Sequence, residues 1–446
     1  LESEAHSIIR GMDLLGHHEF ARRSLDFFIK RYNKEGFLTT GYTMMGTGWH
    51  LWTLGEHYNL AKDKEWLAKA ASEVVRVCRW ISAQRQKTKK LDARNEKVPE
   101  YGLMPPGVQA DWNAFAYHFS LNGYYYAGLK QATEALADIG YAGADDLLAD
   151  ASEFREDILR SYHWTQARSP VYKLKEGTWV PAYPGQLNCP GPTGDFFPGE
   201  DANRSWCYDV ELGAHQMVTQ GVLDADSAEV TQMMKHMEDV QFLADGWFDY
   251  PASRNARDWF NLGGFSKVQP YYCRNAEIYA MRNEVKPFIR SYFNALASLL
   301  NEENLSLWEH FHNAGAWNKT HETGYFLQQT RFMLVMEHGS ELWLAPLVTN
   351  NWLKNGMIIS AKNMPTRFGP VSFEIESHTA EGYIEAKIDS PVRQRPERLV
   401  LRLRHPEGKQ IRRVFINGTE SRDFDLSREC VYIEPKTKRI QLRAEY

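Results

Sequence analysis

The residues best suited to acid–base chemistry lie in the segment 307–326, which reads LWEHFHNAGAWNKTHETGYF. Glu309 stands between Trp308 and His310, and a second histidine follows at His312. Burial beside Trp308 would raise the pKa of the Glu309 carboxyl, whereas a positively charged histidine nearby would lower it. A carboxyl tuned in this way can act as a general acid or base. The alternative is that Trp308 anchors the loop and Glu309 is a solvated surface charge.

The same segment continues with side chains that could bind a flat, polar ligand. Trp317 offers an aromatic face, and a helix is expected to begin near Asn318. His321 and Glu322 then fall in the first turn of that helix. We therefore expect this one segment to supply both a catalytic carboxyl and binding side chains.

Carboxylates also lie next to aromatic residues in the segment 99–112. Glu100 and Tyr101 precede a run rich in Gly and Pro, which favours a stiff, non-helical loop. Asp111 and Trp112 follow at the expected start of the next helix, where Asp111 could simply be an N-cap. Glu100 and Asp111 are candidate catalytic carboxyls, and Tyr101 and Trp112 are candidate binding residues.

A third acidic segment covers residues 196–205. Glu200 is a candidate general acid, and its structural alternative is capping of the helix that follows. Arg204 can pair with a neighbouring carboxylate, or it can bind the carboxylate of a uronic acid through two parallel N–H groups. This segment therefore adds a second possible carboxyl and a cation.

Tryptophans complete the set of candidate binding residues. Trp247 and Trp259 lie in a long irregular segment, and Trp49 lies near the start of a helix expected over 46–61. Each could stack on a sugar, and each could instead be a packing residue. Cleavage of a glycosidic bond needs one carboxyl to protonate the leaving oxygen and another to activate water or attack the anomeric carbon. Carboxylates and aromatics on the same loops are what a carbohydrate cleft requires.

These loops need a scaffold, and the sequence indicates a helical one. Apolar residues recur at spacings of three and four in about eleven segments. The segments are 3–15, 18–32, 46–61, 64–86, 111–138, 143–163, 204–222, 227–243, 266–282, 284–300 and 319–337. A further apolar stretch, Glu341 to Leu353, is expected to complete the set.

The links between these helices alternate between short and long. Short links make antiparallel hairpins. A hairpin period repeated about six times favours a closed ring, an (α/α)6 toroid over residues 1–355. In such a ring all long links fall at one end, which is where functional residues are expected. The long links are about 33–45, 87–110, 164–203, 244–265 and 301–318.

The pattern changes to strands near the C-terminus. Short runs of alternating residues, separated by turn signals such as Asn417-Gly418, fill residues 356–446. They predict a small C-terminal antiparallel β-sandwich. We expect it to pack against the toroid without contributing chemistry.

Composition excludes several classes of protein. The 446 residues carry a formal net charge of -5, which argues against nucleic-acid and membrane partners. No apolar run is long enough for a transmembrane helix. No Walker, G-x-G-x-x-G, G-x-S-x-G or H-E-x-x-H motif occurs, and no spacing of ligands indicates a metal or another cofactor. A carbohydrate is the expected partner.

The pair Trp308-Glu309 followed by Asn318-x-x-His321 resembles the segment that carries the general base in inverting α-L-rhamnosidases. More broadly, the chain resembles the six-hairpin glycosidase superfamily, and the order of toroid and β-sandwich matches. The resemblance implies that Glu309 is the general base. It also implies a general acid in an acidic loop before the first helices. The sequence begins at Leu1 without a Met, so we expect it to be either a piece of a longer protein, with further N-terminal domains, or a processed product.

Three functions remain open from the sequence. The first is an exo-acting, inverting glycoside hydrolase similar to α-L-rhamnosidases. The second is a polysaccharide lyase on uronic-acid glycans, since Tyr, His and Arg are plentiful in the loops. The third is a non-catalytic glycan-binding fragment.

Overall fold

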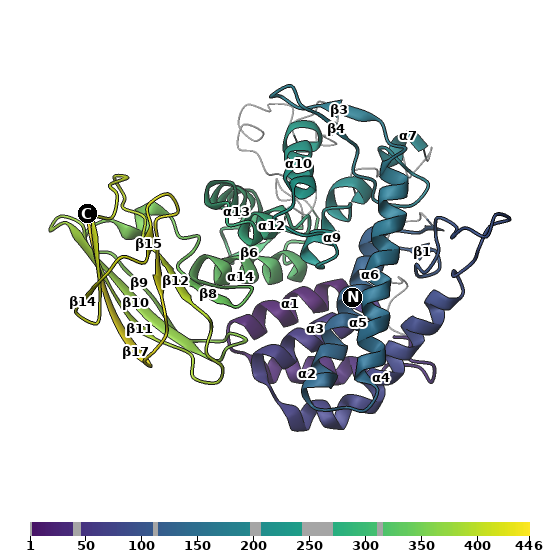
Figure 1. The fold of residues 1–446 in the computed structure, drawn as a ribbon, viewed down its shortest axis with the longest axis horizontal. Helices are drawn as coiled ribbons and strands as arrows, with labels where there is room; N and C mark the ends of the chain where they lie inside the picture. Colours follow the sequence, from purple (N-terminus) through teal and green to yellow (C-terminus); the bar gives the residue numbers. More distant parts are fainter. Residues whose placement is uncertain (1, 39–45, 110–114, 197–206, 243–270, 310–314) are drawn as a thin grey trace.

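The structure, a computed structural model, describes residues 2–38, 46–109, 115–196, 207–242, 271–309 and 315–446. It consists of a helical ring and a β-sandwich that lies to one side of it (Figure 1). In the described residues no helix is both long and apolar enough to cross a membrane.

Parallel helical segments form the inner wall of the ring. Each contacts the next along the chain, and the last contacts the first, so the ring closes. In chain order they are α1 (Glu2–Leu14), α3 (Gly46–Ala61), α5 (Phe119–Asp138), α9 (Gln216–Thr219), α12 (Asn275–Met281) and α14 (Thr320–Leu334). Because α3 and α5 are surrounded by neighbours, most residues of both are buried.

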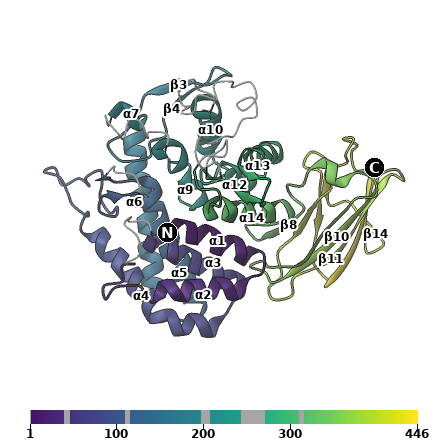
Figure 2. The same ribbon diagram turned by 180° about the vertical axis from the view of Figure 1, so that it is seen from behind.

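The outer wall consists of helices that return antiparallel to the inner ones (Figures 1 and 2). Local signals set their limits. The Asp63 side chain accepts a hydrogen bond of 2.9 Å from the backbone N–H of Trp66 and caps the helix that follows. Ser227 caps a later helix by accepting from Val230 N–H at 3.2 Å. The outer helices are α2 (His18–Ile29), α4 (Lys64–Gln86), α6 (Ala144–Gln166), α10 (Ala228–His236) and α13 (Val285–Leu299).

The closing contact, between α1 and α14, is unusually close. Gly11 and Gly324 lie at the crossing, and a Cβ on Gly324 would be 2.3 Å from the carbonyl carbon of Ser7. Glu4 pairs with Lys319 and Arg10 with Gln328, so the two helices run in the same direction. The inner helices therefore begin at one common end, where the long links enter, and finish at the other. These two ends are called the long-loop end and the short-link end below.

Several predicted helices are shorter than the sequence pattern indicated. The helix expected over 111–138 begins at Phe119, because residues 115–116 form strand β2 (Phe115–Ala116) and pair with β1 (Gly107–Val108). The helix expected over 204–222 is divided into a π-helical turn, η1 (Cys207–Glu211), and α9. A second π-helical turn, η2 (Met237–Phe242), follows α10.

The end of the ring was predicted wrongly. Residues 335–337, expected in the last helix, belong to strand β7 (Val335–His338), and Glu341 to Leu353 contains strand β8 (Glu341–Leu344) and a 3-10 turn, η5 (Asn350–Leu353). Gly339, with φ 56°, lies in the tight turn of this hairpin. The apolar residues of the hairpin alternate, so Leu342 and Leu344 enter the sandwich core.

The C-terminal strands form the predicted sandwich of two sheets. One has the order β14-β13-β17-β11-β10-β9 and the other β15-β16-β12-β8-β7. Pairing is antiparallel except between β8 and β12. The strands are β9 (Ile358–Met364), β10 (Val371–His378), β11 (Tyr383–Asp389), β12 (Leu399–Arg402), β13 (Arg413–Ile416), β14 (Thr419–Ser421), β15 (Phe424–Asp425), β16 (Cys430–Ile433) and β17 (Arg439–Glu445).

The ring and the sandwich are in direct contact. The Arg393 guanidinium donates hydrogen bonds to the carbonyl oxygens of Leu60, at 2.8 Å, and Thr366, at 2.9 Å. The sheet that contains β7 and β8 includes residues before 356, and the division of the chain between residues 355 and 356 remains a prediction.

The close crossing of α1 and α14 gives a stability prediction. Gly324→Ala places a methyl group against the backbone of Ser7, where rigid atoms cannot yield, so it should lower the free energy of unfolding by about 1–3 kcal/mol. Thr323→Ala, one residue earlier on the same helix, is the control. Urea unfolding followed by circular dichroism measures both, and equal stability of the two variants would contradict the crossing.

Candidate active site

The long-loop end of the ring gathers carboxylates around one lysine. The Lys319 Nζ lies 3.0 Å from Glu4 Oε1 and 3.1 Å from Glu309 Oε1. Burial acts to lower the pKa of Lys319, but the two carboxylates outweigh it and hold that pKa above its usual range. Lys319 is therefore a fixed positive charge that orients both carboxylates.

Glu309 lies in a loop that its own carboxylate helps to close. Its backbone N–H donates to Ala316 O at 2.9 Å, and the Ala316 N–H donates to Glu309 Oε2 at 3.3 Å. The Glu309 side chain is 22% exposed, so it meets Lys319 on one side and solvent on the other. An ionised carboxylate that is both held and accessible has the properties of a general base.

The predicted aromatic residues of this loop differ in exposure. Trp308 is half-buried, and its backbone N–H donates to Leu299 O at 2.9 Å, which anchors the start of the loop. Trp317 is 55% exposed, and Ser306 Oγ donates to its carbonyl oxygen at 2.6 Å. The Trp317 ring is thus available at the surface, in a segment of fixed backbone that directly follows the Ala316 contact with Glu309.

Glu322 lies in the first turn of α14, as predicted, but it is completely buried. Within the part of the chain that the structure describes, neither oxygen of its carboxyl has a hydrogen-bond partner. Burial and the nearby Glu211 carboxylate raise the pKa of Glu322 well above its ordinary value, and Lys319 only partly offsets them. Glu309 and Glu4 add to the repulsion. Burial at this position therefore favours the neutral form of the Glu322 carboxyl.

His321 and Trp49 form part of an aromatic core instead of an open surface. The His321 ring lies 4.4 Å from that of Tyr272 and stacks on Tyr325 at 5.9 Å, while Trp49 meets it edge-on at 6.3 Å. Burial lowers the pKa of His321 to about 3, so the imidazole is neutral. Both residues are buried and pack beneath the surface of the long-loop end.

A buried network of ions lies behind this aromatic core. Arg274 pairs with Glu277, which also binds Arg10 at 3.0 Å, and Arg10 Nε lies 3.0 Å from Glu56 Oε2. Arg274 further donates to the Tyr325 hydroxyl at 3.0 Å. These contacts tie α1, α3, α12 and α14 together. The sequence did not reveal this network, because Arg10, Glu56 and Glu277 lie far apart in the chain.

The π-helical turn η1 holds two acidic residues that the sequence analysis also missed. Asp209 accepts hydrogen bonds from Thr193 N–H at 2.9 Å and from Thr193 Oγ1 at 2.7 Å. Burial nevertheless raises the pKa of Asp209 to about 7. Glu211 is buried and close enough to Glu322 to raise its pKa. π-Helical turns are frequent at functional sites, and this irregularity was the one available signal.

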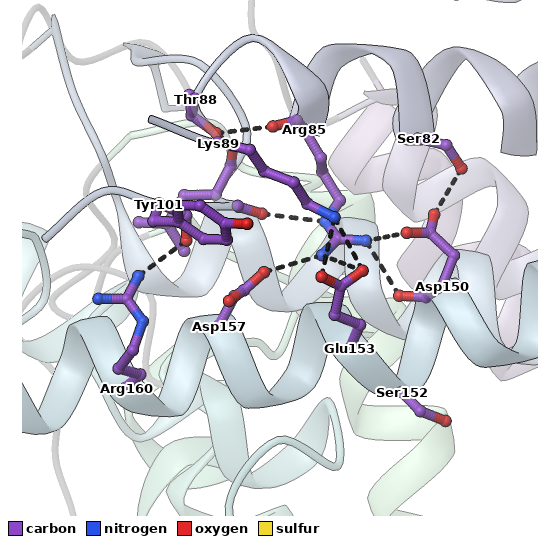
Figure 3. Close-up of polar contacts among 12 residues, drawn as sticks. Ser82, Arg85, Thr88, Lys89, Tyr101, Asp150, Ser152, Glu153, Asp157 and Arg160 are labelled. Carbon is purple, nitrogen blue, oxygen red and sulfur yellow. Dashed lines mark hydrogen bonds and ion pairs between the residues drawn. The ribbon is translucent and has the colours of Figure 1, made fainter. Parts of the chain in front are cut away.

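The loop with Glu100 and Tyr101 is clamped to outer helices (Figure 3). Arg160 donates to the Tyr101 carbonyl at 2.8 Å, and the buried Arg85 donates to Gly102 O at 2.9 Å. Lys97 lies 4.3 Å above the Tyr101 ring. Glu100 and Tyr101 are therefore held in a separate charged cluster, and no described contact brings them to Glu309.

The remaining predicted site residues lie outside the described part of the chain. They are Asp111, Trp112, Glu200, Arg204, Trp247, Trp259, His310 and His312. Their roles remain predictions.

No protein-family model matches the sequence, and no curated protein is similar to it. Among solved structures, an α-L-rhamnosidase from Dictyoglumus thermophilum is similar in fold, with a TM-score of 0.57 and 11% identity. It covers 100% of this chain, which spans 46% of the length of that structure. This likeness shows the fold, a helical toroid followed by a β-sandwich.

Two further solved structures match at lower TM-scores. A GH127 β-L-arabinofuranosidase from Geobacillus stearothermophilus T6 has a TM-score of 0.43 and 12% identity, covering 99% of this chain and 71% of its own. A metal-independent α-mannosidase from Streptococcus pneumoniae has a TM-score of 0.48 and 9% identity, covering 73% of this chain and 84% of its own.

The raised pKa of Glu322 predicts a dependence of stability on pH. Its pKa is higher in the folded chain than the ordinary 4.5, so the unfolded chain releases this proton first and the folded state loses stability as pH rises above about 4.5. Glu322→Gln removes that loss. Its stability relative to the unsubstituted protein should therefore increase from pH 4.5 upward, while the exposed Glu303→Gln should show no such trend. Denaturant unfolding at several pH values measures this difference. If the free energies of unfolding of Glu322→Gln and of the unsubstituted protein changed in parallel with pH, a raised pKa of Glu322 would be contradicted.

Proposed function

We propose that this protein is a glycoside hydrolase that acts on an oligo- or polysaccharide with inversion, in the manner of an α-L-rhamnosidase, and that Glu309 is its general base. The observation that carries the proposal is the Glu309 carboxylate, 3.1 Å from Lys319 and partly exposed at the long-loop end. The similar fold of a solved α-L-rhamnosidase supports it.

The proposed base has a simple chemical task. An ionised Glu309 accepts a proton from a water molecule as that water attacks the anomeric carbon, opposite to the leaving oxygen. Lys319 keeps the carboxylate ionised and fixed in direction, because its Nζ binds Oε1 while the Ala316 N–H binds Oε2. The exposed Trp317 ring supplies a flat apolar surface on which a sugar ring can stack.

A second carboxyl must protonate the leaving oxygen. The candidates from the sequence are Glu200 and Asp111, which lie outside the described residues, and Glu100, which the structure holds in a separate cluster. The structure adds Asp209, which is itself buried. A general acid works best when its pKa lies near the working pH, and the pKa of Asp209 is about 7. The pKa of Glu322 is also raised, but this carboxyl is fully buried, so we assign it to support of the site. The exo mode of action rests on the resemblance of the segment 307–326 to rhamnosidases.

The two alternatives are less well supported. A lyase needs an accessible base beside the uronate, yet Tyr272, His321 and Arg274 are buried at this end of the ring. Arg274 is moreover neutralised by Glu277. A non-catalytic glycan-binding fragment would have no need for a carboxylate held by a lysine. Products heavier by one water in total would distinguish hydrolysis from elimination, and absence of product would favour the binding fragment.

Glu309→Gln tests the base directly. The amide keeps the size of the side chain but cannot accept a proton, so kcat should fall by about 10²–10⁴-fold while sugar binding persists. Glu302→Gln, an exposed carboxylate on the preceding hairpin, should leave kcat unchanged. Rates are measured with a panel of rhamnosides and related glycosides by mass spectrometry of the products. Full activity of Glu309→Gln would remove it from the mechanism.

A further inference from the structure

A second group of potential ligands lies at the short-link end of the ring, away from Glu309. It consists of Asp13 near the end of α1, His18 at the start of α2 and His57 in the second half of α3. Asp13 and His57 are buried, and the His18 side chain is 36% exposed. Three neighbouring helices therefore each contribute one residue to the same point.

The geometry of this group suits a small cation. His18 Nδ1 lies 2.6 Å from Asp13 Oδ1, and His57 Nδ1 lies 3.0 Å from Asp13 Oδ2. One nitrogen or oxygen from each residue lies within 4.8 Å of the other two. Ligands of a tetrahedral zinc ion at about 2.0–2.2 Å are separated from each other by about 3.4 Å. Shifts of about an ångström would therefore bring all three atoms into coordination.

The backbone holds the three residues in this arrangement. After α1 the chain turns at Gly16, which has φ 97°, and the Gly16 N–H donates to Asp13 O at 2.9 Å. This tight turn returns His18 to Asp13. The His57 ring is fixed by Trp66, which it meets edge-on at 5.1 Å. A prearranged site loses less entropy on binding a metal than a flexible one.

The surroundings favour a positive charge and allow access. The C-terminal ends of α1 and α3 lie here and carry partial negative charge, whereas the start of α2 carries partial positive charge. The Asp13 carboxylate adds a full negative charge, so the net local charge favours a cation. Asp13 also lines a cavity of about 710 Å³ that continues towards the β-sandwich past Glu337 and Arg367. A water molecule can reach the site from this cavity and complete the coordination.

We propose that Asp13, His18 and His57 bind a zinc ion, with water as the fourth ligand. Two imidazole nitrogens and one carboxylate are typical of zinc, whereas calcium and magnesium prefer oxygen ligands. The ion joins α1, α2 and α3 at the end opposite to the carboxylates, so its role is to stabilise the ring and not to take part in hydrolysis. The sequence analysis did not predict it, because the histidines show no metal-binding spacing.

The test is a zinc titration of the chelator-treated protein, followed by calorimetry and thermal melting. We expect one zinc ion to bind per chain and to raise the melting temperature. His18→Ala should weaken zinc binding by at least about tenfold and abolish the thermal shift. His17→Ala, an exposed neighbour, is the matched control and should bind as the unsubstituted protein does.

A second variant guards against misfolding. His57→Gln retains a hydrogen-bond donor for Asp13 but removes the imidazole, so it should fold and bind zinc weakly. Equal zinc affinity in His18→Ala and His17→Ala would overturn the proposal, as would failure of the unsubstituted protein to bind zinc. The readout is metal binding, so the result is independent of whether Glu309 is catalytic.

Discussion

The direct packing of the first inner helix against the last is the contact on which the rest of the structure depends. At the crossing of α1 and α14 only glycine fits, since Gly324 would place a Cβ 2.3 Å from the Ser7 backbone. This approach closes the ring. It also brings Glu4 to Lys319, a pair separated by 315 residues in sequence, and Lys319 in turn holds Glu309. The geometry of the proposed base therefore follows from ring closure.

Closure also determines the charges inside the ring. All inner helices begin at the long-loop end, where their positive ends favour the carboxylates of Glu4 and Glu309. Deeper in the ring, Arg274 and Arg10 share Glu277, so each buried charge has a partner. Among the described residues Glu322 has no hydrogen-bond partner, and burial raises its pKa and favours its neutral form. The opposite end receives the C-terminal ends of the same helices, which is where the Asp13 cluster lies. One scaffold thus provides different electrostatic settings at its two ends.

Local patterns in the sequence predicted much of the fold. The helices over 46–61 and 64–86 have the predicted limits, because apolar periodicity and the Asp63 cap are encoded within each segment. Strand alternation after residue 356 was equally clear. The hairpin of β7 and β8 was predicted as helix because the spacing of its apolar residues fits both a helix and a strand. Only their packing in the core of the sandwich selects the strand.

The site was predictable only in part, since it depends on contacts between distant segments. The sequence placed Glu309, Trp317 and Glu322 together, and the structure describes all three near Lys319. It could not reveal that Lys319 fixes Glu309 or that Glu322 is buried. Those facts depend on Glu4 and Glu211, which belong to other helices. The distinction between an accessible carboxylate and a buried neutral one needs three-dimensional information.

The most direct test of the central claim is to remove the Glu309 carboxylate and to supply an external nucleophile that needs no general base. Glu309→Ala, assayed on an aryl glycoside with a good leaving group, should be nearly inactive in water. Azide requires no deprotonation, so its addition should restore turnover and give a glycosyl azide of inverted configuration, which NMR of the anomeric proton identifies. Hydrolysis by Glu309→Ala at the unsubstituted rate, with no effect of azide, would contradict the assignment of Glu309 as the base.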